Sequence, residues 1–75
     1  MSMVITYSQA RQLTLDRMNQ QIANLPQSEL NRPRYVVGFQ SYSILDMKAQ
    51  VERGTQIGRT WVMNEAERLN YVVRG

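Results

Sequence analysis

The sequence predicts a mostly helical α+β fold in a single domain, residues 1–75, with a long N-terminal helix, one central strand or hairpin, and one or two C-terminal helices. Two capping signatures, which begin at Thr6 and Ser43, mark the starts of helices. A β-branched and aromatic run at residues 34–40 predicts a strand between them. A chain of 75 residues can bury only one core, so all of these elements must share it.

The first helix is expected from about Thr6 to Leu25. Gln9 completes the capping box, and Pro26 ends the helix because proline has no backbone N–H to continue it. A narrow apolar stripe follows the helical spacing: Leu15, Met18, Ile22 and Leu25. The opposite face is rich in glutamine and asparagine, and we interpret it as solvated rather than as a surface for a partner.

The middle of the chain is expected to form a polar connector followed by the strand. Residues 27–33 form the connector, with one helical turn at 28–30. In the strand at 34–40, the side chains of Tyr35, Val37 and Phe39 would share one face. Backbone groups of a lone strand need partners, so it must pair within the chain or with another copy.

A second capping box, Ser43 with Asp46, starts the next helix. This helix is expected to end at Arg53, because Gly54 suits the left-handed conformation that often follows a helix. Residues 54–60 contain two glycines but lack the lysine and spacing of a phosphate-binding P-loop. We interpret them as a turn between two helices.

The last predicted helix begins near Thr55 or Thr60, and a helical stripe continues along it: Val62, Ala66, Leu69 and Val73. Residues 70–73 have two interpretations. They are either the final turn of this helix, which the continuous stripe favours, or a second strand that pairs with the strand at 34–37.

Composition excludes several classes of protein. The chain has no cysteine and no histidine, so it has no disulfide and lacks the usual ligands of zinc and other transition metals. It also lacks the side chains that most often act as nucleophile or general base near neutral pH. We therefore expect no enzymatic activity, no catalytic residues, no metal and no cofactor. Small domains that lack a stabilising disulfide or metal ion usually depend on another chain for stability. We therefore expect a protein partner, as a homo-oligomer or within a larger assembly.

The sequence also bears on location. It has no apolar run of the roughly 18–20 residues that a membrane span needs, and its N-terminus does not resemble a signal peptide. We therefore expect no membrane association. The absence of cysteine fits a reducing compartment, so the expected location is cytoplasmic, or the virion if the protein derives from a phage.

Basic and aromatic residues are the candidates for binding. The net charge is +3, a modest value for a nucleic-acid-binding domain, and arginine supplies eight of the nine basic residues. Arginine, aromatic residues and methionine are enriched at the centres of protein interfaces. Six residues are the predicted interface or phosphate contacts: Arg32, Arg34, Tyr35, Arg59, Trp61 and Tyr71. For each arginine the alternative is a solvated charge, and this alternative is favoured. For the aromatic residues the alternative is packing in the core, which is favoured for Trp61 and equally weighted with an interface role for Tyr71.

Residues 43–51, which begin with the Ser43–Asp46 cap and follow a β-rich stretch and a helix, resemble small phage head-completion proteins of the lambda W type. That resemblance implies a helix, a β-hairpin and a second helix, in a protein without enzymatic activity that sits between portal and tail. The stretch compared, residues 35–53, covers about a quarter of the chain.

The order strand, helix, helix from Arg34 to Val73 also looks like that of ribbon–helix–helix repressors. This resemblance implies a dimer whose paired strands enter the DNA major groove, with Arg34, Val36 and Gln40 facing DNA and the 54–60 turn near phosphate. The first hypothesis is a non-enzymatic assembly or protein-interaction module. Its most specific form is a phage-type head–tail joining protein. The alternative is a dimeric DNA-binding regulator, with nucleic acid as the second choice of partner.

Overall fold

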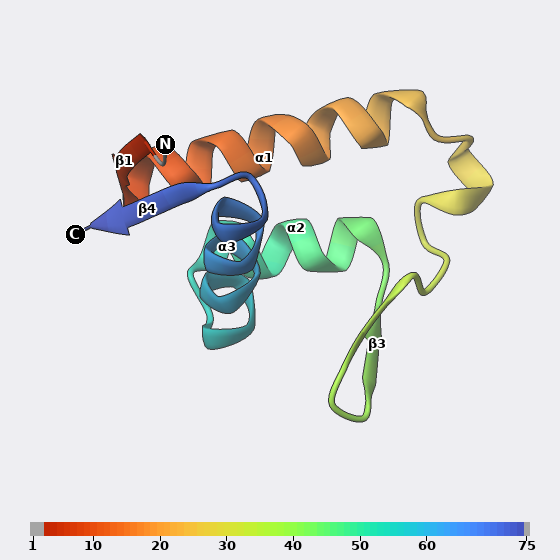
Figure 1. Cartoon of the computed structure of the whole chain (residues 1–75). Helices are drawn as coiled ribbons and strands as arrows, with labels where there is room; N and C mark the ends of the chain where they lie inside the picture. Colours follow the sequence, from red (N-terminus) through yellow and green to blue (C-terminus); the bar gives the residue numbers. More distant parts are fainter. Residues whose placement is uncertain (1–2, 75) are drawn as a thin grey trace.

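Three helices form the body of the protein in a computed structural model that describes residues 3–74 (Figure 1). They are α1 (Tyr7–Asn24), α2 (Ile44–Arg53) and α3 (Gln56–Arg68). Each helix packs against the other two, and two separate two-stranded sheets complete the fold. The predicted α+β class, with its long N-terminal helix and two C-terminal helices, is confirmed.

Helix α1 begins where the capping box predicts. The Thr6 hydroxyl accepts the Gln9 backbone N–H at 3.1 Å, and the Gln9 side chain accepts the Thr6 N–H at 2.9 Å. Leu25, the residue before proline, leaves the helix in an extended conformation. The apolar stripe is only partly confirmed, because the buried residues of α1 all lie in its first two thirds: Ala10, Thr14, Leu15 and Met18. Beyond Met18 the helix continues with no buried side chain.

A one-turn 3₁₀-helix, Gln27–Glu29, leads from α1 to an antiparallel hairpin. The hairpin consists of β2 (Tyr35–Val37) and β3 (Gln40–Tyr42), with Val37 opposite Gln40. The expected strand across 34–40 is therefore wrong beyond Val37. Gly38 has a φ of 62°, which starts a tight two-residue turn, so Phe39 lies in the turn rather than on a face with Tyr35 and Val37.

Two glycines shape the junction between α2 and α3 in different ways. Gly54 has a φ of 68° and ends α2 in the left-handed conformation, as predicted. Thr55 then caps α3, accepting the Gly58 N–H at 3.2 Å, so the earlier of the two expected starts is confirmed. Gly58 lies inside α3, where it lets the helix approach the backbone of Gln50 in α2.

The C-terminal residues correct the favoured interpretation of 70–73. Asn70 has a φ of 64° and ends α3, and residues 71–74 form strand β4 (Tyr71–Arg74). Its partner is β1 (Met3–Thr6), in parallel register from Met3 opposite Tyr71 to Thr6 opposite Arg74, and not the strand at 34–37. Val73 continues the helical spacing of α3 by coincidence: in β4 it is half-buried against the core.

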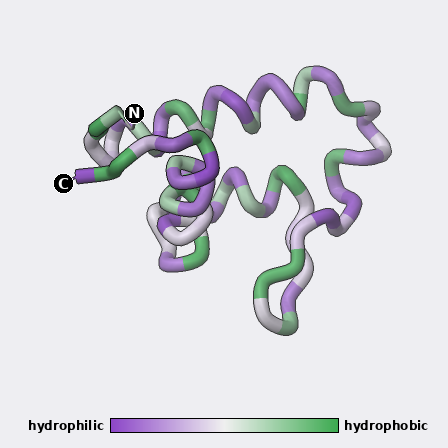
Figure 2. The backbone as a smooth tube through the Cα atoms, viewed as in Figure 1, coloured by the Kyte–Doolittle hydropathy of each residue, from purple (hydrophilic) through white to green (hydrophobic). Residues whose placement is uncertain are grey.

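The core lies where the three helices meet the β1–β4 sheet. Its buried residues come from every one of these elements except β4: Ile5, Ala10, Leu15, Met18, Met47, Val51, Val62 and Ala66. Half-buried aromatic residues surround it, among them Tyr7, Tyr35, Trp61 and Tyr71. Figure 2 shows that α1 is mostly hydrophilic, with short hydrophobic stretches between, so few of its residues are suited to the core. The part of α1 up to Met18 packs on the core, and the rest of the helix extends beyond it without a buried side chain.

The hydroxyl of Tyr7 is buried without a hydrogen-bond partner. We expect Tyr7→Phe to raise the free energy of unfolding by about 1 kcal/mol, because it removes a desolvated polar group and keeps the ring. The Arg59 guanidinium, 5.8 Å from the ring centroid, retains its aromatic neighbour in this variant. Urea denaturation followed by circular dichroism measures the change. Tyr42→Phe is the control and should leave stability unchanged, and a destabilised Tyr7→Phe variant would show that the hydroxyl is bonded.

Candidate interaction site

The β2–β3 hairpin projects from the start of α2, away from α1 (Figure 1). Its outer part carries three exposed apolar side chains, Val36, Val37 and Phe39, which we call the hairpin tip. Phe39 is fully exposed, and Val36 is 73% exposed. The turn itself requires only the glycine, because a two-residue turn that begins with Gly accepts many residues at its second position. Neither the turn nor the core of this chain therefore accounts for a phenylalanine at position 39.

The base of the hairpin is fixed to the body. The backbone N–H of Arg34 donates to the carbonyl oxygen of Tyr42 at 2.9 Å and closes the hairpin. The ring of Tyr35 meets that of Trp61 in α3 edge to face, with centroids 4.7 Å apart. Tyr35, Tyr42 and Trp61 also pack against the core. The tip is thus an exposed apolar projection on an anchored base.

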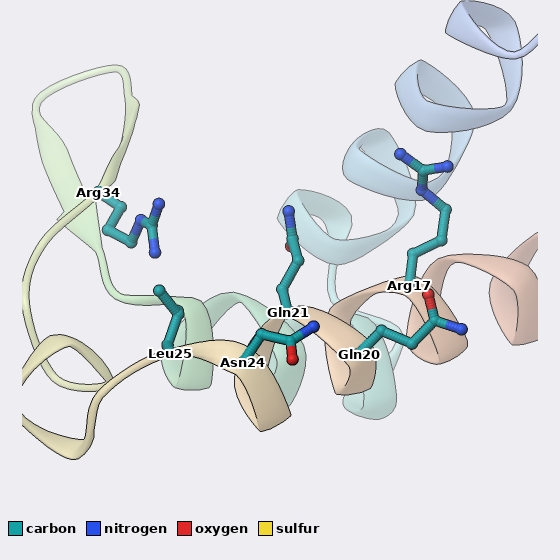
Figure 3. Close-up of a pocket in the computed structure, with 6 residues that line it drawn as sticks. All are labelled: Arg17, Gln20, Gln21, Asn24, Leu25 and Arg34. Atoms are coloured by element: carbon teal, nitrogen blue, oxygen red, sulfur yellow. The ribbon is translucent and has the colours of Figure 1, made fainter.

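A second feature lies at the foot of the hairpin. It is an open cavity of about 400 Å³, which we call the notch, and six residues line it: Arg17, Gln20, Gln21, Asn24, Leu25 and Arg34. Arg17, Gln20, Gln21 and Asn24 belong to α1, and Leu25 is the residue that follows its C-terminal end. In Figure 3, Arg34 extends from the foot of the hairpin toward Gln21, which points from α1 into the same space. Arg17, one turn earlier on α1, points to the same side.

The notch carries positive charge without a carboxylate to balance it. Its lining contains two arginines, three carboxamides and one leucine. Among the described residues, the two ion pairs lie elsewhere: Arg32 with Glu29 and Arg68 with Glu65, both at 3.1 Å. The C-terminal end of α1 contributes roughly half a negative charge, which is less than the two full positive charges of Arg17 and Arg34. The notch therefore favours an anionic group.

The structure separates the six predicted site residues into several places. Tyr35 and Trp61 contact each other at the base of the hairpin, half-buried. Arg34 lines the notch, whereas Arg32 is paired with Glu29. Arg59 and Tyr71 lie apart from this group: Arg59 stacks over Tyr7, and Tyr71 sits in β4 against the core.

Sequence reasoning did not single out the tip, and it interpreted the face of α1 that supplies Gln20 and Asn24 to the notch as solvated rather than as a surface for a partner. For the tip, the signal was present as Gly38 followed by Phe39, since a glycine within a β-rich run indicates a turn. For the notch, residues 17, 20, 21 and 24 recur at the spacing of one helix face, with arginine and carboxamides and no apolar side chain. That this face meets Arg34 depends on how the chain returns after Pro26, which spacing alone does not indicate.

Neither a protein-family model, nor a curated protein, nor a solved structure matches the chain. Over residues 3–74, no helix combines the length and apolar character needed to cross a bilayer. The same range contains no cluster of three or more acidic side chains that could hold a metal ion. The geometry of the tip and the notch is accordingly what bears on function.

Proposed function

We propose that the protein is a non-enzymatic assembly module that binds other protein chains through its hairpin. The observation that carries this proposal is the fully exposed Phe39 on a hairpin whose base is anchored to the core. Burying one phenylalanine side chain contributes about 1.5–3 kcal/mol, and buried aromatic anchors dominate the binding energy of many interfaces. A solvent-exposed phenylalanine on a fixed projection is suited to fill a pocket or pack on a partner.

The partner we propose is a second copy of the chain. Within residues 3–74, strands β2 and β3 pair only with each other, so the outer edge of each is without a strand neighbour there. Hairpins from two copies could pair edge to edge around a two-fold axis, which would satisfy these backbone groups and cover Val36 and Phe39 together. A small domain with a thin core would gain from such a shared sheet. A head–tail joining role of the phage type is the specific form of this proposal, supported by the resemblance of residues 43–51.

The DNA-binding alternative has less support. A ribbon–helix–helix dimer builds its ribbon from one strand of each chain, whereas β2 already pairs with β3 of its own chain. Arg34 faces the notch beside α1, although the resemblance implies that it faces DNA. We therefore propose assembly rather than DNA regulation.

Phe39→Ser tests the proposal. We expect the native protein at micromolar concentration to have at least twice the monomer mass of 8.8 kDa in light scattering. We expect the variant to be a monomer with unchanged circular dichroism, because Phe39 makes no contact with the core. Met63→Ser changes another exposed apolar residue, on α3, and should keep the native mass. A native monomer, or an equally large Phe39→Ser variant, would contradict the proposed self-association.

A further inference from the structure

We propose that the notch is a binding site for carboxylate side chains of an acidic protein segment. This inference goes beyond the proposed self-association, because it assigns a second contact surface with a different chemistry. The tip is apolar and lies at the outer end of the hairpin, whereas the notch is cationic and lies at its foot. The two surfaces share no residue.

The two arginines reach the notch from independent, fixed positions. Arg17 lies within the part of α1 that packs on the core, and its neighbour Met18 is buried there. Arg34 is held by its backbone hydrogen bond to Tyr42 at the mouth of the hairpin. Both arginines are exposed residues, and neither forms an ion pair within residues 3–74. A guanidinium group presents a planar fork of donors that matches the two oxygens of a carboxylate.

The carboxamides between the arginines indicate a peptide as the ligand. The side chains of Gln20, Gln21 and Asn24 each offer a donor and an acceptor, and none of these side chains has a hydrogen bond to another described residue. Such groups can pair with the N–H and C=O groups of an extended peptide that carries the carboxylates. The volume of about 400 Å³ lies within the range of about 300–1,000 Å³ typical of ligand sites.

A polynucleotide fits the notch less well than an acidic peptide. Proteins that bind duplex DNA commonly neutralise about 6–10 phosphates, and the notch supplies two cations. No aromatic side chain lines it, so it offers no surface on which a base could stack. The observations therefore favour carboxylates over a phosphate backbone.

The test is a titration of the ¹⁵N-labelled full chain with a hexaglutamate peptide, followed by NMR. We expect saturable shifts of the Arg17 and Arg34 side-chain N–H signals and of the notch carboxamide signals, which weaken as salt is added. Arg17→Gln and Arg34→Gln should each weaken binding about five-fold, and the double variant about 20-fold. Arg53→Gln removes the same charge at the end of α2, outside the notch, and should bind as the native chain does.

Two further probes identify the ligand class. A hexaglutamine peptide of the same length should not bind, and a 12-base-pair DNA duplex should bind more weakly than hexaglutamate. Equal binding of hexaglutamine, tighter binding of the duplex, or hexaglutamate binding that survives loss of both arginines would overturn the inference. Repeating the titration with Phe39→Ser separates this site from self-association, because binding in the notch should be the same in that variant.

Discussion

Replacing Gly58 with alanine should destabilise the protein by about 3 kcal/mol, the largest effect we expect from adding a single methyl group. A Cβ atom at this position would meet the carbonyl group of Gln50 and lie 2.7 Å from the backbone nitrogen of Val51. The carbonyl oxygen of Gln50 also accepts the N–H groups of Gly54 and Thr55, so it cannot move without loosening the junction between α2 and α3. Overpacking usually costs about 1–3 kcal/mol, and contact with backbone places Gly58 at or above the upper end.

The gain in helix propensity from glycine to alanine is smaller than the cost of this clash. Alanine favours a helix over glycine by about 1 kcal/mol, which offsets only part of the clash. Urea denaturation of Gly58→Ala and the native protein measures the difference. Gly54→Ala is the matched control: nothing lies within 4 Å of its added Cβ, so only the left-handed backbone conformation opposes it. That control should cost about 1–2 kcal/mol. A Gly58→Ala variant as stable as the native protein would show that the helices are not in backbone contact there.

Met47→Ala is expected to destabilise the protein by about 3 kcal/mol. Met47 is fully buried in α2 and belongs to the core that joins the three helices. Truncating a buried methionine to alanine typically costs about 2–5 kcal/mol, through lost burial and the cavity that remains. A domain of this size has a total stability of roughly 4–11 kcal/mol, so the loss is a large part of it.

Met63→Ala provides the comparison for the same chemical change at an exposed site. Met63 lies on α3 and is 44% exposed, so its truncation should change the free energy of unfolding by less than about 0.5 kcal/mol. Thermal unfolding followed by circular dichroism measures both variants. Similar losses for Met47→Ala and Met63→Ala would contradict the position assigned to the core.

The local signals in the sequence predicted the helices well. Both capping boxes are present as hydrogen-bond pairs, and Gly54 ends α2 as expected, because these features depend on residues within one turn of each other. The β1–β4 pair was not predictable in the same way. Each strand has four residues, and what makes them strands is their contact with each other across nearly the whole described chain. Val73 fits the helical spacing of α3 in the sequence, but the positive φ of Asn70 ends the helix before this residue is reached.

The candidate site shows the same division between local and distant information. The anchoring aromatics Tyr35 and Trp61 were selected by residue type, and the structure does bring them together. Their role in holding the hairpin, and the exposure of Phe39, depend on where the strand turns. Arg34 was selected without Arg17, because the notch exists only once the chain has returned and brought Arg34 near the C-terminal end of α1.

The parallel pairing of β1 with β4 has a consequence for the order of folding. The strand that follows α3 must return to the strand that precedes α1, so this contact closes the longest loop in the described structure. We expect docking of the three helices to shorten that loop first, so that pairing of the strands is the final step. During synthesis on the ribosome, the backbone N–H and C=O groups of Ile5 and its neighbours lack their strand partner until residues 71–74 have emerged. The nascent chain therefore carries an incomplete edge until translation has passed β4.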